Sequence, residues 1–244
     1  MVNLLYTELL KLKRSKMFLV SMIGASAAPI MMFIAYLSQM KKDPYAVIPF
    51  ETAFYNTNLN IMLLLGVLLY GVITAYLFNR EFVEDTLKNL LTIPVSRVAL
   101  LISKLLMLLL WILLLTMVAW VLTLALGFMI KTDGLSTSVL LKSIQDYVLG
   151  ALLMFLLSTL TIWVTFLFKN YVPTIMFTAV ITLGNVTVIS SDYKAIFPWS
   201  AAHVIVSHSY VPEYPPLYSI LAIGVTSIIG FVASVVYFNR IDIK

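Results

Sequence analysis

Long uninterrupted apolar runs dominate the hydropathy pattern of this chain, and six of them are long enough to cross a membrane. A helix rises about 1.5 Å per residue, so about 20 apolar residues span the roughly 30 Å hydrocarbon layer. The runs are too long and uniform for barrel strands, which have about ten residues and alternate in polarity. We therefore predict an all-α, polytopic membrane protein that forms one transmembrane domain over residues 1–244. The predicted spans are 17–38, 59–79, 98–128, 145–168, 172–190 and 217–238.

The composition supports a membrane protein and excludes several other classes. Of the 244 residues, 61% are hydrophobic and 11% are charged, whereas a soluble domain carries about 25% charged residues. The absence of cysteine excludes disulfides, thiol catalysis and cysteine-ligated metals. The net charge of +5 is compatible with nucleic-acid binding. Because the basic residues cluster beside apolar runs, contact with anionic lipid headgroups explains them better, and we expect no nucleic-acid partner.

The basic residues are distributed unevenly between the two sides of the predicted bundle. With the N-terminus inside, eleven of the sixteen Lys and Arg residues lie on the cytoplasmic side and five lie outside. Cytoplasmic loops are enriched in Lys and Arg, so we predict a multi-pass cell-membrane protein with both termini in the cytoplasm. The inner set is Lys11, Lys13, Arg14, Lys16, Arg80, Lys88, Arg97, Lys104, Lys169, Arg240 and Lys244, and the outer set is Lys41, Lys42, Lys131, Lys142 and Lys194.

The segment before the first run has the pattern of an amphipathic helix. Leu5, Leu9 and Leu12 recur at helical spacing, and cations such as Lys11 and Lys13 occupy other faces. This pattern is typical of a helix that lies on the inner leaflet before the chain enters the membrane. The alternative interpretation is a simple positively charged boundary before a span.

The first apolar run also contains a feature of secretory signal peptides. Ala25-Ser26-Ala27 resembles the small-residue cleavage site of such a peptide. The apolar sequence continues beyond this site to Leu37, which makes the run long enough to span a bilayer. We therefore expect an uncleaved first transmembrane helix.

The connection between the second and third runs, residues 80–97, is more distinctive than a simple loop. Glu81, Glu84, Asp85 and Lys88 follow an i, i+3, i+4, i+7 pattern, which places them on one face of a helix. Acidic residues on a shared face would be repelled by anionic lipid, so a soluble partner explains this face better than the membrane surface does. A helix that lies on lipid remains the alternative.

Pro94 and Ser96 define how this connecting helix ends and the next one begins. Pro94 disfavours the α conformation at the preceding residue and so ends the helix. Ser96 is suited to N-cap the following helix, which becomes the third span. The pattern predicts a short amphipathic helix with a sharp end at the cytoplasmic mouth of two spans.

The same segment resembles the signature of ABC-2 type transporter permeases. Glu84-Asp85-Thr86, the pair Leu90-Leu91, Pro94 and Ser96-Arg97 correspond to the Glu-x-Gly-Thr, paired-leucine and Pro-x-Ser/Thr-Arg elements of that family. The resemblance is strongest to the small permeases of bacitracin-resistance and lantibiotic-immunity exporters. Asp85 departs from the family pattern, which usually has Gly there, so the start of the helix is in question.

The resemblance implies a permease subunit of an ATP-driven exporter for an amphipathic substrate such as a peptide antibiotic. Two permease subunits, identical or homologous, would form the path, and two separate ATPase subunits would dock on their cytoplasmic loops. The residues that it implies for ATPase coupling are Glu81, Glu84, Asp85, Thr86, Leu87, Leu91, Pro94 and Arg97.

The sequence contains no nucleotide-binding loop of its own. No Gly-x-x-x-x-Gly-Lys-Ser/Thr motif occurs, so this chain has no phosphate-cradling loop with which to bind ATP. Gly66 and Gly71 have the spacing of the two glycines, but no lysine follows, and packing between helices explains them better. We expect no cofactor on this chain and no enzymatic activity, with ATP hydrolysis on a separate partner chain.

Two other classes of function are weighed against the exporter. A gradient-driven carrier or channel would need buried charge at mid-membrane, and an intramembrane enzyme would need convergent His, Asp or Glu side chains in the spans. Only Asp146 and Lys104 are candidates, and both lie near span ends, from which we expect their side chains to reach the interface. His203 and His208 have a spacing that suits a shared metal site poorly, so we expect no metal.

The predicted outer segment, residues 191–216, is rich in aromatic residues and proline. We hypothesise that Phe197, Pro198 and Trp199 gate the outer mouth or contact the substrate. The alternative is a belt of interfacial aromatic residues that only anchors the protein at headgroup level.

Overall fold

The computed structural model describes residues 2–13, 15–43, 45–83, 96–130 and 132–240, with side chains from residue 4 onward. In these ranges the chain is helical apart from short connections and two isolated bridges. The helices are α1 (Val2–Lys13), α2 (Lys16–Lys42), α3 (Phe50–Asn60), α4 (Gly66–Val83), α6 (Arg97–Met129), α7 (Thr137–Phe168), α8 (Tyr171–Val188), α9 (Pro198–Ser207) and α10 (Pro216–Arg240), with a π-helical turn η1 (Ile61–Leu65) and a 3₁₀ turn η2 (Asp192–Ala195).

Six of the helical stretches are long and apolar enough to cross a membrane, which confirms the predicted all-α, polytopic fold. They are α2, the continuous run Phe50–Val83, α6, α7, α8 and α10. The run Phe50–Val83 begins nine residues before the predicted span 59–79, because polar residues of α3 such as Asn56, Thr57 and Asn58 lower its hydropathy without ending the helix.

Helix α7 also begins earlier than hydropathy indicates. It starts at Thr137, whereas the apolar run starts at about residue 145. The hydroxyl of Ser136 accepts a hydrogen bond from the backbone N–H of Val139 and so caps the helix at that point. The first two turns, which lie outside the predicted span 145–168, carry Lys142, and the helix continues through it.

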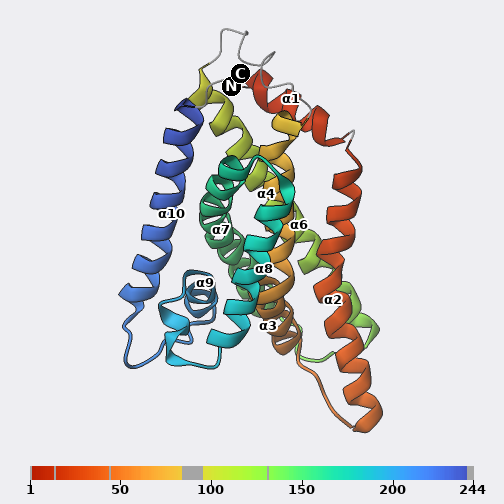
Figure 1. The fold of residues 1–244 in the computed structure, drawn as a ribbon. Coiled ribbons are helices and arrows are strands. Elements are labelled where there is room, and N and C mark those ends of the chain that lie inside the picture. The colour runs from red at the N-terminus through yellow and green to blue at the C-terminus, as the bar shows by residue number, and fades with distance from the viewer. Residues whose placement is uncertain (1, 14, 44, 84–95, 131, 241–244) are drawn as a thin grey trace.

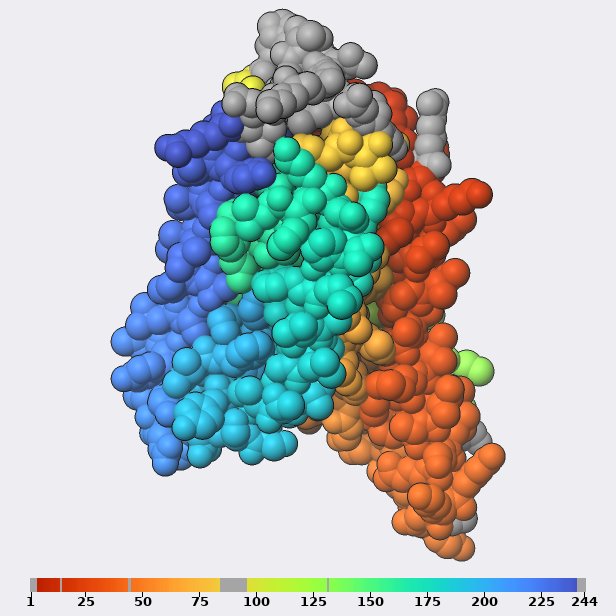
Figure 2. Space-filling view, viewed as in Figure 1, coloured from red at the N-terminus to blue at the C-terminus, as the bar shows by residue number. Residues whose placement is uncertain are grey.

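Helices α4 and α7 lie in the middle of the bundle, with α2 and α6 on one side and α8 and α10 on the other (Figure 1). In the most apolar window of Phe50–Val83, 67% of the residues are buried, against 22% for α2 and 28% for α8 and α10. Figure 2 shows α8 on one face between α10 and α2, with the last turns of α2 standing away from the other helices. The outer helices therefore carry most of the apolar surface that would face lipid.

Two glycines allow helices to approach closely. A Cβ at Gly71 of α4 would collide with the side chain of Thr178 in α8. A Cβ at Gly230 of α10 would collide with the backbone of Leu160 in α7. Small residues of this kind let transmembrane helices pack backbone against backbone. The expectation that Gly71 serves helix packing agrees with its position.

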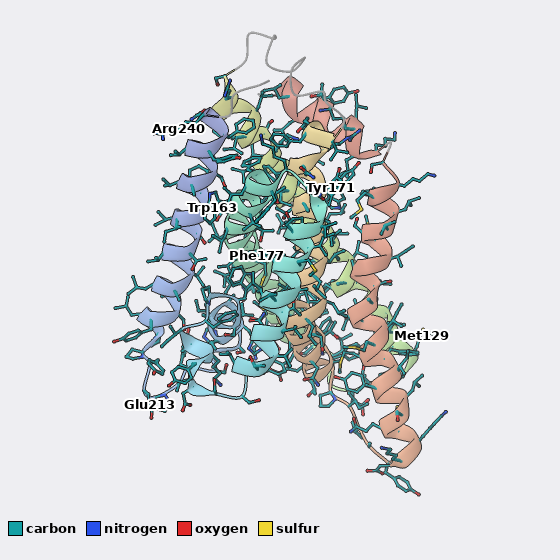
Figure 3. The ribbon with its side chains drawn as sticks, in the orientation of Figure 1. Met129, Trp163, Tyr171, Phe177, Glu213 and Arg240 are labelled. Atoms are coloured by element: carbon teal, nitrogen blue, oxygen red, sulfur yellow. The ribbon has the colours of Figure 1, made fainter. Side chains whose placement is uncertain are left out.

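The two ends of the bundle differ in structure, and we name them by the helices that lie there. The α1 end holds α1 together with the last turns of α4 and α10, so both termini of the described chain lie there (Figure 1). The α9 end holds α3, η2 and α9, and α9 contacts α7, α10 and η1. Figure 3 labels Arg240 at the α1 end and Glu213 at the α9 end, with the apolar Phe177 between them.

Candidate functional site

Two acidic and two basic side chains meet at the α1 end. We call them the charge cluster: Glu8, Glu81, Lys11 and Lys104. Glu8 and Lys11 come from α1, Glu81 from the last turn of α4 and Lys104 from the second turn of α6. Lys104 Nζ lies 2.6 Å from Glu81 Oε2 and 3.7 Å from Glu8 Oε2. Lys11 Nζ lies 3.0 Å from Glu8 Oε1 and 3.3 Å from Glu81 Oε1. The cluster therefore ties α1, α4 and α6 together.

The charge cluster is mostly hidden from solvent, and its charges balance. Glu81 is 3% exposed, Lys104 is 7% exposed and Glu8 is 8% exposed. Lys104 Nζ also donates a hydrogen bond of 2.8 Å to the carbonyl of Leu77, which satisfies a further proton of its ammonium group. Burial alone would lower the pKa of Lys11, but the carboxylates of Glu8 and Glu81 raise it above its ordinary value, so Lys11 is charged at neutral pH. Two carboxylates thus neutralise two ammonium groups.

Arg97 joins the start of α6 to the end of α10. Its guanidinium donates hydrogen bonds to the carbonyls of Phe238 (3.3 Å) and Asn239 (3.0 Å) in the last turn of α10. These carbonyls lack partners within the helix, and a cation near them also interacts favourably with the helix dipole. Ser96 caps α6, since its hydroxyl accepts from the N–H of Ala99 at 3.2 Å, as the sequence predicts.

Asn79 connects α4 to the turn between α7 and α8. In the orientation that satisfies both neighbours, its amide donates to the carbonyl of Lys169 and accepts from the N–H of Tyr171, each at 3.1 Å. Lys169 ends α7 in a left-handed conformation, with φ of 50°. Asn79 and Glu81 therefore fix the last turns of α4 to α1, α6 and the α7–α8 turn.

The residues predicted for ATPase coupling divide into two groups. Glu81 and Arg97, which lie near the two ends of the connection 80–97, are described, and both bind other helices of this chain. Because Glu81 is buried, its role in coupling would pass through Lys104 and α1 rather than through direct contact with a partner. The other predicted coupling residues lie outside the described residues: Glu84, Asp85, Thr86, Leu87, Leu91 and Pro94.

Sequence reasoning missed part of the cluster. We expected Lys104 to extend to the interface, but its ammonium is buried, because Glu81 and the carbonyl of Leu77 supply partners within the bundle. Glu8 went unnoticed inside a basic segment. The sequence did contain a signal for this cluster. Lys104 is a lone cation in an apolar run, and the predicted topology places Glu8 and Glu81 at the same end of the bundle.

The residues predicted for the outer gate lie at the α9 end. Pro198 is the first residue of α9, where its missing N–H has no cost. Trp199 is 7% exposed, and its ring lies 6.5 Å from that of Phe177 in α8 and 6.0 Å from that of Phe197. Figure 3 labels Phe177 on α8 near the middle of the bundle. These contacts join α9 to α8, and a gating role stays a prediction.

Comparison with known proteins identifies the class to which this arrangement belongs. The family described as ABC-2 family transporter protein matches residues 4–185, a range that includes the whole charge cluster and the connection 80–97. The chain belongs to the ABC-2 transporter family. It is also 51% identical over 207 residues to the bacitracin transport permease protein BCRB of Bacillus licheniformis, which covers 85% of this chain and 100% of that relative.

Membership in the ABC-2 family makes this chain a transport subunit of the membrane rather than a catalyst. The structure agrees with a membrane subunit, since it has six helical stretches that are long and apolar enough to cross a membrane. The charged residues it buries link helices to one another at one end of the bundle.

Proposed function

We propose that this ABC-2 permease is the membrane subunit of an ATP-driven exporter that removes a peptide antibiotic such as bacitracin from the membrane or cell. The observation that carries the proposal is the 51% identity to a bacitracin transport permease across that relative's full length. The complex would contain two permease chains, identical or homologous, and two ATPase chains. The sequence has no phosphate-cradling motif, so in this proposal ATP is hydrolysed on the partner chains.

We place the α1 end in the cytoplasm. The supporting observation is the charge count, eleven basic residues on this side against five on the other. This orientation puts α1, the connection 80–97 and the last turn of α10 within reach of a soluble ATPase. It puts the α9 end at the outer leaflet.

The contacts at the α1 end suggest how force from the ATPase would spread through the permease. Residues 84–95 connect Val83 to Ser96, so a push on them acts on both the end of α4 and the start of α6. At α4, Glu81 transmits it to Lys104 and Lys11, and therefore to α6 and α1. At α6, Arg97 transmits it to α10. The spans would then move as coupled units, because packed helices shift between discrete arrangements rather than deform.

A susceptibility assay tests the proposal. We expect a bacitracin-sensitive bacterium to gain protection when it expresses this permease together with its ATPase, and to gain none when the ATPase carries a lysine-to-alanine change in its phosphate-binding loop. Glu84→Arg is expected to remove protection while the permease still reaches the membrane. Glu213→Arg, an exposed acid at the α9 end, is the matched control and should keep protection. Equal protection by the permease alone would contradict the proposal and favour a gradient-driven carrier.

A further inference from the structure

A cavity of about 270 Å³ with several polar side chains in an otherwise apolar wall lies at the α9 end, between α3, α7 and α9. Its walls carry Glu51, Tyr55, Lys142, Asp146 and His203, which come from segments far apart in the sequence. Pockets for whole drug-sized ligands measure about 300–1,000 Å³. At about 270 Å³ this cavity lies just below that range and is large enough for one side chain of a larger molecule.

The charged side chains of the cavity leave one carboxylate in excess. Lys142 Nζ lies 2.7 Å from Glu51 Oε1, so these two groups neutralise each other at the rim, where both are about 60% exposed. Asp146 lies one helical turn further along α7 on the same face and is only partly exposed. The charges of Lys142 and His208 act on its carboxylate, but within the described part of the chain neither forms an ion pair or a hydrogen bond with it. A cationic group would supply the missing partner.

His203 supplies a second unsatisfied group, from α9. It is 5% exposed, and its Nδ1 has no hydrogen-bond partner among the described residues. Burial, and to a smaller extent the nearby charge of Lys194, lowers its pKa to about 4, so the ring is neutral at neutral pH. A neutral imidazole can accept a hydrogen bond and does not repel a cation. Nδ1 itself has no accessible surface, so a ligand in the cavity would use the other ring nitrogen, Nε2, as its acceptor.

Aromatic rings complete the lining. The ring of Tyr55 lies 5.9 Å from that of His203 in an edge-on arrangement, and Tyr55 itself is 47% exposed at the rim. Phe54 stacks on Trp120 at 5.7 Å behind it, and Trp120 donates to the hydroxyl of Ser143 in the cavity wall. Aromatic faces attract cations and also accept the alkyl chain that carries them.

We propose that this cavity binds a primary ammonium group on a side chain of the peptide substrate, with the carboxylate of Asp146 and a nitrogen of His203 as its hydrogen-bond acceptors and Tyr55 beside its alkyl chain. The inference rests on the proposed function, because it assigns part of the recognition of a peptide cargo to the α9 end. A phospholipid ammonium headgroup fits less well. Its phosphate would be repelled by the carboxylates of Glu51 and Asp146, and Lys142 is the single ammonium group of the lining that could offset these negative charges.

Binding is measured on the full chain in nanodiscs of phosphatidylglycerol, without an ATPase. The probes are two synthetic amphipathic peptides that differ at one position, lysine in one and the uncharged isostere norleucine in the other. We expect the lysine peptide to bind about tenfold more tightly or better, as charge-assisted hydrogen bonds exceed neutral contacts. Asp146→Asn should remove that difference and leave the norleucine peptide unaffected. Glu213→Gln, an exposed acid at the same end that does not line the cavity, should leave both affinities unchanged.

The imidazole NMR spectrum of ¹⁵N-histidine-labelled protein locates the bound peptide. The chain has two histidines, so His208→Asn leaves His203 as the one labelled ring. We expect its signal to shift with the lysine peptide and not with the norleucine peptide. An unchanged circular-dichroism spectrum and size-exclusion profile of ligand-free Asp146→Asn show that this variant folds, and Asp146→Glu should restore part of the preference.

Three results would overturn the inference. The first is equal binding of the two peptides, and the second is an undiminished lysine preference in a folded Asp146→Asn variant. The third is a shift of His203 by phosphatidylethanolamine alone, with loss of peptide binding, which would assign the cavity to a lipid headgroup. The binding assay contains no ATPase, so it tests the cavity separately from the exporter function. If any of these three results occurred while the susceptibility assay still showed protection from bacitracin, the inference about the cavity would fail and the proposed exporter function would stand. Intact binding without protection would contradict the function instead.

Discussion

The two ends of this permease differ in whether their charged side chains are buried and paired. At the α1 end, Glu81 and Lys104 are buried and paired, and their partners come from three helices. At the α9 end, the ion pair of Glu51 and Lys142 is exposed, while groups deeper in the cavity lack partners. A fully paired buried cluster fixes helices relative to one another. A partly satisfied pocket is suited to a ligand, and this contrast separates the region that would transmit force from the region that would meet cargo.

The largest expected effect comes from breaking the charge cluster. Among the described residues, Lys104→Met leaves Lys11 as the one ammonium group paired with Glu81 and Glu8, so one buried carboxylate loses its countercharge. We expect the free energy of unfolding to fall by about 3–5 kcal/mol, the range for a broken buried ion pair. Unfolding of the purified permease in mixed micelles, followed by circular dichroism, measures the loss.

A double variant separates pairing from packing at this site. Glu81→Leu combined with Lys104→Met removes one charge of each sign and leaves the Glu8–Lys11 pair, so we expect it to regain most of the stability that Lys104→Met loses. Equal destabilisation by the single and double variants would mean that the side chains matter for their shape and not for their charge.

A smaller effect is expected from acidification at the α9 end. The folded state holds the pKa of His203 at about 4, whereas an unfolded histidine has a pKa near 6.5. The unfolded state therefore binds more protons between these values, and stability should fall as the pH decreases from about 6.5 to 4, by about 3 kcal/mol. His203→Gln should lack this component when the same pH series is repeated. Parallel pH profiles of the variant and the wild type would show that His203 does not titrate in this way.

Breaking the contact between α6 and α10 is expected to lower the free energy of unfolding by less than Lys104→Met or acidification does. Arg97→Gln removes the cation that caps the last carbonyls of α10, and we expect a loss of about 1–2 kcal/mol, because hydrogen bonds from a charged group are partly screened near solvent. Hydrogen exchange should increase in the last turn of α10 more than in α7. Unchanged exchange there would contradict the role assigned to Arg97.

The smallest effect is expected at the exposed ion pair. Lys142→Met removes the partner of Glu51, and both side chains are about 60% exposed. Exposed ion pairs contribute about 0–1 kcal/mol, so unfolding should change by less than that. A loss as large as that of Lys104→Met would abolish the distinction between the two ends.

The sequence predicted the class of fold more fully than the details of the site. Hydropathy alone located six spans, because apolar length is a direct requirement of the bilayer. It placed the starts of the second and fourth helices too late, since polar residues such as Asn58 and Lys142 continue a helix when they face a cavity or a neighbouring helix. Pattern alone does not show what a residue faces.

At the charge cluster, too, the sequence predicted the positions of residues but not their partners. Spacing placed Glu81 and Arg97 on the connection between two spans, but it could not show that both bind inward, to Lys104 and to α10. Those partners are 23 and about 140 residues away in the chain, and their approach depends on how the helices pack. The cavity at the α9 end was also beyond prediction, because it combines α3, α7 and α9, which only the folded chain brings together.

The most direct test of the account is bacitracin transport into inside-out proteoliposomes that contain the permease and its ATPase. We expect accumulation that requires ATP and persists when ion gradients are dissipated. We expect Glu84→Arg to abolish it, whereas Glu213→Arg should transport normally. Accumulation without ATP, or normal transport by Glu84→Arg, would contradict the claim that a separate ATPase drives this permease through its α1 end.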